Sequence, residues 1–104
     1  MIKASFIKKN GKFVNFRVSG HSGYSEQGSD IVCAAVSSMV MLAINTATED
    51  FGVQASVIIE EENAVIDFTP DNADERAHLI ISGLLRELKA LENDFPKNVS
   101  VIVK

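Results

Sequence analysis

The sequence has few of the residues that mark several common protein classes. Its 104 residues contain one cysteine, two prolines, two histidines and no tryptophan. The single cysteine, Cys33, excludes an intrachain disulfide, and the chain offers no second pair of metal-ligand residues at a recognisable spacing. Collagen-like and low-complexity classes are excluded by the low glycine and proline content. We therefore expect neither a bound metal nor a cofactor.

The sequence also lacks any run of basic residues longer than Lys8-Lys9. With 14 acidic and 10 basic side chains, the formal net charge is -4 and the sequence pI is about 5.0. Proteins that hold nucleic acid through its phosphates usually need a basic face. The charge balance therefore predicts no direct contact with nucleic acid and favours a basic partner.

No apolar run has the length of an ordinary membrane span. The longest runs from Ile31 to Ile44 and still includes Ser37 and Ser38, whereas a span needs about 20 residues. Met1 is followed by an alternating pattern rather than by the apolar segment of a signal peptide. The composition, 46% apolar and 23% charged, is that of a globular protein. We expect a single domain over residues 1–104 that is cytoplasmic and makes no membrane contact.

Alternating apolar positions predict two strands in the first part of the chain, over residues 2–9 and 12–19. The Asn10-Gly11 pair between them is a strong hairpin signal, because a type I′ turn needs positive φ at both positions. In the second strand we expect one face to carry Val14, Phe16 and Val18. Residues 20–29 hold three glycines and three serines and predict a mobile loop, longer than the usual connection of about 4–6 residues.

A helix is predicted to begin near Asp30, which is a good N-cap residue, and to end at about Glu49. Positions 31–36 and 39–44 are all apolar, although a helix that packs on a sheet needs only one apolar stripe. We therefore expect one side of this helix to lie on the sheet and the other to face a partner subunit or a substrate.

The second half of the sequence predicts another hairpin, a second helix and a last strand. The two strands of the hairpin are expected over 53–60 and 64–69. The helix is expected to begin within 69–72 and to end at Phe95-Pro96, and the last strand is expected over 99–103. The order ββαββαβ predicts an α+β fold, a two-layer sandwich in which two helices cover one face of a mainly antiparallel sheet. We expect His78 on the solvated side of the second helix, and we interpret the acidic run Glu60-Glu61-Glu62 as a solvated turn.

Cys33 and His21 are the candidates for covalent chemistry. A thiol in the first turn of a helix lies near free backbone N–H groups and the positive end of the dipole, which lower its pKa. A nearby histidine could take its proton, and the N–H groups of Cys33 and Ala34 could hold a developing oxyanion. The spacing leaves a structural alternative open, because a lone cysteine in an apolar helix is usually a core residue. A lone histidine at the end of a strand is also more often a surface residue than a base.

Two polar residues share the predicted helix face with Cys33. Asp30, Cys33 and Ser37 stand at i, i+3 and i+7. Asp30 could orient His21 as the third member of a triad, or it could only cap the helix. Ser37 could donate a hydrogen bond to the site or to the backbone one turn earlier.

Two segments resemble the ribosomal-processing cysteine proteases of bacteria, the Prp family. They are Gly20-His21-Ser22-Gly23-Tyr24 and Gly28-Ser29-Asp30-Ile31-Val32-Cys33-Ala34-Ala35-Val36-Ser37. Ser22 stands where an alanine is often found. The size and the ββαββαβ order agree along essentially the whole chain, and the C-terminal half matches only in its pattern.

The resemblance implies that Cys33 is the nucleophile and His21 the base. It implies a homodimer and a glycine-rich lid or substrate-binding loop, whose candidate residues are Gly20, Ser22, Gly23, Tyr24 and Gly28. It also implies a reaction: removal of the N-terminal extension of large-subunit ribosomal protein number twenty-seven, with the cut after paired phenylalanines.

Two other functions are compatible with the sequence. The first is a non-catalytic module that binds the ribosome or a basic ribosomal protein, with Cys33 packed in the core. The second is a thiol acyltransferase or a redox sensor. Intramolecular disulfide chemistry is disfavoured, because the chain has no second cysteine to resolve an oxidised Cys33.

Overall fold

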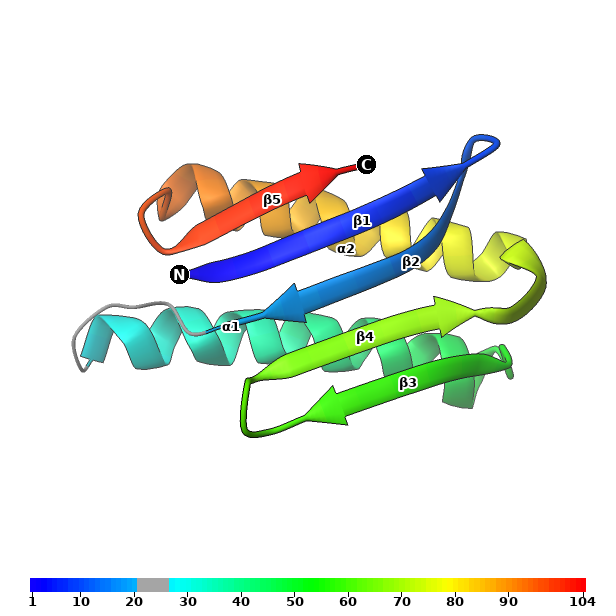
Figure 1. Ribbon diagram of the computed structural model, residues 1–104, viewed down its shortest axis with the longest axis horizontal. Coiled ribbons are helices and arrows are strands. Elements are labelled where there is room, and N and C mark those ends of the chain that lie inside the picture. The colour runs from blue at the N-terminus through cyan, green and yellow to red at the C-terminus, as the bar shows by residue number, and fades with distance from the viewer. Residues whose placement is uncertain (21–26) are drawn as a thin grey trace.

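In the residues that the structure describes, five strands form one sheet and two long helices cover one of its faces (Figure 1). The computed structural model describes the backbone of residues 1–20 and 27–104 and the side chains of residues 1–20 and 31–104. The elements are β1 (Ile2–Lys9), β2 (Lys12–Ser19), α1 (Gln27–Asn45), β3 (Ala55–Glu60), β4 (Val65–Pro70), α2 (Glu75–Asp94) and β5 (Val99–Val103). The strand order is β3-β4-β2-β1-β5, in which only the β1–β5 pair is parallel. The predicted α+β fold and its ββαββαβ order are confirmed.

The β1–β2 hairpin has the predicted turn, but the residues on the core face of β2 differ from the prediction. Asn10 and Gly11 have φ values of 53° and 80°, as a type I′ turn requires. A β-bulge then follows, because Ile7 pairs with Asn15 whereas Lys8 pairs with Phe13. The extra residue in the bulge shifts the side-chain alternation by one position. Phe13 therefore joins Phe16 and Val18 in the core, and the prediction that Val14 shares their face is wrong.

The core lies between the sheet and the helices. Phe16 is its centre: its ring lies 5.9 Å from that of Phe6 in β1 and 5.3 Å from that of Phe68 in β4. The helices complete the core with Val40 of α1 and Leu88 of α2, both fully buried. Three aromatic rings from three strands thus fix the middle of the sheet, on which both helices pack.

The first helix begins earlier than predicted and also ends differently. It starts at Gln27 instead of near Asp30, and after Asn45 it continues as a π-helical turn over Thr46–Asp50. The stretch Ile31–Asp50 is therefore long and apolar enough, by length and composition alone, to cross a membrane. The shorter apolar run in the sequence did not indicate this. Val32 and Val36 are nevertheless buried, so part of the apolar character of the helix serves the protein core.

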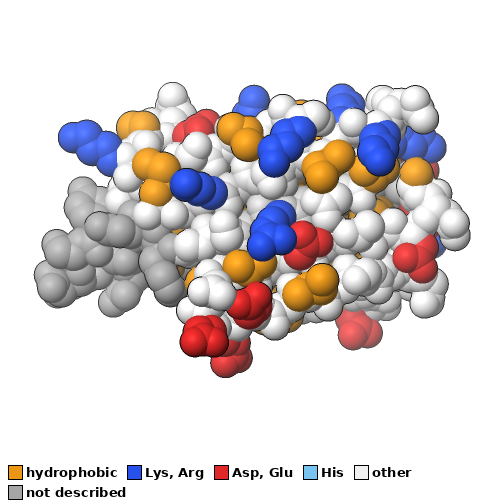
Figure 2. All heavy atoms as spheres, viewed as in Figure 1, with side chains coloured by type: hydrophobic (Ala, Val, Ile, Leu, Met, Phe, Trp, Pro, Cys, Tyr) orange, Lys and Arg blue, Asp and Glu red, His pale blue; other side chains and the backbone are white. Residues whose placement is uncertain are grey.

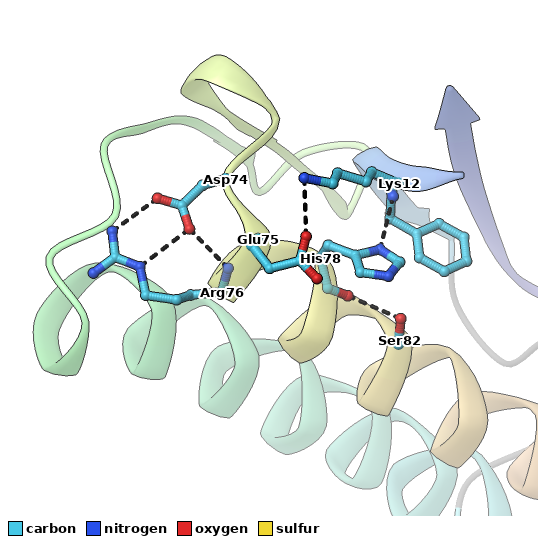
Figure 3. A network of polar contacts seen from close by, with 7 residues as sticks. Lys12, Asp74, Glu75, Arg76, His78 and Ser82 are labelled. Carbon is cyan, nitrogen blue, oxygen red and sulfur yellow. Dashed lines mark hydrogen bonds and ion pairs between the residues drawn. The ribbon is translucent and has the colours of Figure 1, made fainter. Parts of the chain in front are cut away.

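The second helix begins at Glu75, later than the predicted 69–72, because Asn72 and Ala73 take left-handed conformations with φ of 59° and 48°. Asp74 caps the helix: its carboxylate accepts a 2.8 Å hydrogen bond from the Arg76 backbone N–H. The Arg76 guanidinium also donates to Asp74, as Figure 3 shows, with an Nη2–Oδ2 distance of 2.8 Å. This side-chain hydrogen bond lowers the pKa of Asp74 to about 2.

His78 is half-buried, so the expectation that it is solvated is wrong. Its Nδ1 accepts a 3.0 Å hydrogen bond from the backbone N–H of Phe13, and the two rings stack with centroids 5.6 Å apart. Beside it, Lys12 and Glu75 form an ion pair of 2.9 Å, and the Ser82 hydroxyl donates to the His78 carbonyl (Figure 3). These contacts attach the first turns of α2 to the β1–β2 hairpin, next to the bulge.

Replacing His78 by alanine should therefore destabilise the protein. The backbone N–H of Phe13 would lose its acceptor and the ring stacking would be lost, at a cost of about 1–2 kcal/mol in the free energy of unfolding. Urea titration followed by circular dichroism measures this cost. The matched control is Leu79→Ala, since Leu79 is the next residue of α2 and its side chain is 61% exposed. Equal stability of the two variants would contradict a structural role for His78.

Candidate active site

A pocket of about 340 Å³ lies between α1, the end of β2 and the β3–β4 hairpin. Its walls are mostly aliphatic side chains, and two functional groups that the sequence singled out, the Cys33 thiol and the Ser37 hydroxyl, belong to residues that line it. The remaining lining residues are Ile2, Val18, Gly20, Val36, Val40, Ile59, Glu60, Glu61, Ala64, Val65 and Ile66. The pocket thus combines a thiol, an apolar wall and carboxylates.

The first helix supplies the thiol. Cys33 is half-buried and packs against the core cluster, and Ser37, one turn further along, is exposed. Both line the pocket, which confirms that they share one helix face. The side chain of Asp30, the third residue predicted for this face, lies outside the described residues. Val36 and Val40 are buried on the neighbouring part of the helix surface and hold this face against the sheet.

The early start of α1 changes the surroundings expected for Cys33. The first four N–H groups of a helix have no intrahelical acceptor, and Cys33 lies beyond the first four residues of a helix that begins at Gln27. The expectation that Cys33 is in the first turn, with free N–H groups at Cys33 and Ala34, is therefore wrong. Any donors for an oxyanion must come from elsewhere than this part of α1.

Gly20 forms the edge of the pocket where β2 ends. Its φ is +89°, and a Cβ at this position would lie 2.5 Å from the carbonyl oxygen of Met1. Its N–H donates a 3.1 Å hydrogen bond to the carbonyl of Ala64, in the turn between β3 and β4. The backbone of Gly20 is thus held from two sides, and only glycine fits there without a shift of the chain.

The other residues predicted for the loop lie partly outside the structural description. His21, Ser22, Gly23 and Tyr24 are not among the described residues, and His21 directly follows Gly20 in the sequence. Gly28 belongs to α1, so the expectation of a loop that extends to residue 29 is wrong.

The β3–β4 hairpin contributes pocket residues that sequence reasoning missed. Ile59 and Glu60 line the pocket from the end of β3, and Glu61 lines it from the start of the turn. The acidic run is exposed, as predicted, but it is also part of the site. β3 is an edge strand whose Val57 and Ile58 are exposed as well. The signal in the sequence was the run of three aliphatic residues, Val57 to Ile59, directly followed by three glutamates. The structure shows that the aliphatic residues are exposed, so they do not serve the core.

Metal ligands are not gathered in the described part of the chain. Among these residues, no group of three or more His, Cys, Asp or Glu side chains could hold a metal ion. The chemistry available at the pocket from the described residues is that of a thiol beside an apolar cavity.

Residues 1–100 match the family described as "Cysteine protease Prp". The chain belongs to this family. Among its relatives is the ribosomal processing cysteine protease Prp of Bacillus subtilis, which is 30% identical over 97% of this chain and 96% of the relative. The protein of the same name from Staphylococcus aureus is 22% identical over 94% of this chain and 93% of that protein. The protein is thus a cysteine protease, with Cys33 as its single cysteine.

Solved structures of Prp proteins have the same fold. The S. aureus Prp in complex with a covalently linked product peptide aligns with a TM-score of 0.91 at 22% identity, covering 100% of both chains. A protein from Streptococcus mutans aligns with a TM-score of 0.88 at 27% identity, covering 99% of this chain and 96% of that one. The mixed five-stranded sheet with its two helices is therefore the Prp fold.

The close approach of Gly20 to Met1 can be tested with a pair of glycine variants. Gly11→Ala places a side chain at a positive φ in open space, which should cost about 1–2 kcal/mol. Gly20→Ala adds a steric clash with the Met1 carbonyl and should lower the free energy of unfolding further. Urea unfolding of both variants measures the difference. If Gly20→Ala were no less stable than Gly11→Ala, the close approach would not constrain the pocket.

Proposed function

We propose that this protein removes the N-terminal extension of large-subunit ribosomal protein number twenty-seven, cutting after paired phenylalanines. The observation that carries the proposal is the half-buried Cys33 in the wall of an apolar pocket, in a member of the Prp family. The relatives named above are ribosomal processing proteases, which supports a ribosomal protein as the substrate.

The proposed reaction is acyl transfer through the thiol. His21 takes the proton of Cys33, and the thiolate attacks the carbonyl carbon of the second phenylalanine. The bond between this carbon and the peptide nitrogen breaks, His21 gives its proton to the leaving amine, and a thioester remains on Cys33. Water then hydrolyses the thioester and restores the thiol. His21 directly follows Gly20 in the sequence, and Gly20 lines the pocket together with Cys33.

The shape and charge of the pocket support the proposed specificity. Its volume of about 340 Å³ is at the lower end of the range of small-molecule sites, so it suits a side chain of the substrate. Val36, Val40 and Ile59 offer aliphatic surface to an aromatic ring. Glu60 and Glu61 give the pocket negative charge, which attracts a basic ribosomal protein.

Supporting roles are proposed for two residues of α1. Ser37 is exposed on the pocket face one turn after Cys33, where its hydroxyl can donate a hydrogen bond to the backbone of a bound peptide. Asp30 is our candidate for the residue that orients His21. We also propose that the protein is cytoplasmic, because a single catalytic thiol stays reduced there.

The nucleophile can be tested with a peptide that spans a paired-phenylalanine extension. Mass spectrometry should show one cut, after the second phenylalanine, by the wild-type protein. Cys33→Ser and His21→Ala should lose cleavage, because each removes a group that the reaction needs. The matched control is Ser38→Ala, an exposed residue of α1 that does not line the pocket, and it should cut at the wild-type rate.

Two results would contradict the proposal. Wild-type cleavage rates in Cys33→Ser would remove Cys33 as nucleophile. If the folded wild-type protein left the peptide intact and Cys33 alkylated slowly with iodoacetamide, the binding-module alternative would take its place. Circular dichroism of each variant separates a loss of chemistry from a loss of fold.

We also propose that a second copy of the chain covers the outer face of α1. Ile31 and Leu42 lie on this face with 67% and 70% of their surface exposed. They are eleven positions apart, about three helical turns, so they lie on one stripe of the helix. In a twofold dimer the same stripe of each protomer would meet its counterpart.

Leu42→Glu should therefore shift the protein from dimer to monomer, because it places a charge in the proposed interface. Leu79→Glu is the control, since Leu79 is equally apolar and 61% exposed on α2. Sedimentation velocity at micromolar concentration measures both variants. A wild-type protein that sediments as a single 11.3 kDa species would contradict the dimer.

A further inference from the structure

The charges of the protein are strongly segregated along its sequence and in the fold. The segments 1–20 and 99–104 contain six of the ten basic side chains and none of the 14 acidic ones. These segments form β1, β2 and β5, which are neighbours in the sheet. In Figure 2, Lys and Arg side chains spread over the part of the surface that Figure 1 assigns to these strands, and most acidic side chains lie toward β3 and β4.

Three of these cations lie around a groove on the open face of the sheet, opposite the helices. The groove has a volume of about 230 Å³, and its polar lining residues are Lys3, Ser5, Arg17, Ser19, Ser100 and Lys104. Cations and hydroxyls alternate across it, because Lys3 pairs with Ser19 on one side and Ser100 on the other, and Arg17 pairs with Ser5. Ammonium, guanidinium and hydroxyl groups are all donors to phosphate oxygens.

The three cations of the groove differ in whether a carboxylate already pairs with them. Arg17 has an ion pair with Asp67 of β4 at 3.5 Å, which reduces its net charge toward a ligand. Among the described residues, no salt bridge engages Lys3 or Lys104. The ammonium groups of Lys3 and Lys104 are therefore available to a ligand, and the Arg17 guanidinium is available in part.

The spacing of the cations suits an extended anion better than a compact one. Lys3 and Arg17 are on adjacent strands, two residues apart along the strand, so their Cα atoms are roughly 8 Å apart. Lys104 follows the strand that pairs with β1 and lies four residues along from the level of Lys3, or roughly 14 Å from its Cα. Cα spacings of this size match a chain of phosphates, in which successive groups can each meet one cation.

We propose that the open face of the sheet binds the phosphate backbone of RNA through Lys3, Arg17 and Lys104. The net charge of -4 led us to expect no contact with nucleic acid. Net charge, however, sums over all faces of the protein, and charges further apart than the Debye length of about 8 Å in physiological salt are largely screened from each other. A basic face can therefore bind phosphate although the whole protein is acidic. RNA is preferred over an acidic protein because the proposed substrate is ribosomal, and in this choice the inference rests on the proposed function. The face would hold the enzyme on ribosomal RNA while Cys33 acts on the peptide.

The experiment is fluorescence anisotropy of a short fluorescein-labelled single-stranded RNA with the full-length protein. The wild-type affinity should fall about tenfold between about 50 and 200 mM salt, as release of counterions from two or three phosphates predicts. Lys3→Gln combined with Lys104→Gln should weaken binding at the lower salt about tenfold and reduce the salt dependence. The control is Arg86→Gln combined with Lys89→Gln, which removes the same charge from exposed positions of α2 and should bind like the wild type.

Three results would overturn the proposal: no binding by the wild-type protein at the lower salt, an equal loss in both double variants, or equal affinity for polyglutamate. The last result would assign the face to acidic proteins. Peptide cleavage without RNA should stay at the wild-type rate in all variants, because neither Lys3 nor Lys104 lines the pocket of Cys33. A failure of RNA binding is thus distinct from a failure of the protease assignment.

Discussion

The backbone hydrogen bond from Gly20 to Ala64 is the contact on which the active-site pocket depends. It joins the end of β2 to the turn of the β3–β4 hairpin, two segments that are far apart in the sequence. With this tie in place, the hairpin forms one wall of the pocket and α1 forms the other. It also fixes the point from which the chain continues to His21. The position of the hairpin wall relative to the end of β2 thus follows from the pairing of β2 with β4 and from the absence of a side chain at Gly20. The buried Val36 and Val40 hold the α1 wall, which carries the thiol, against the sheet.

Local patterns in the sequence predicted those parts of the fold that local physics determines. The turn at Asn10-Gly11 needs two residues that accept positive φ, and this requirement is visible in the sequence. The bulge after it is not visible, because Val14, Phe16 and Val18 give an unbroken apolar alternation and only packing selects Phe13 in place of Val14. His78 was misplaced for a related reason. Its Nδ1 accepts a hydrogen bond from the backbone N–H of Phe13, which lies 65 residues earlier in the chain. The apolar periodicity of α2 cannot predict such a contact.

The site was predicted only in part. Residues placed by local helical geometry were found from the sequence, and residues placed by long-range contacts were not. Cys33 and Ser37 are one turn apart on a single helix, so their shared face follows from helical geometry. Gly20 was singled out only as part of a glycine-rich segment, whereas its constraint comes from Met1 and Ala64. The contributions of Ile59, Glu60 and Glu61 depend on the sheet order β3-β4-β2, a long-range property that one sequence does not reveal.

The exposed edge of β3 has a consequence for the solubility of the protein. Val57, Ile58 and Ile59 are exposed on a strand that has a neighbour on one side only within the sheet. A short aliphatic edge of this kind is a template for pairing with the edge of another molecule, the first step of β-aggregation. Glu60, Glu61 and Glu62 follow it directly, and at neutral pH their charges repel a second copy of the same edge. The acidic turn thus has the position of a gatekeeper: it can keep the strand beside the pocket open for a substrate while it prevents two copies of this edge from pairing.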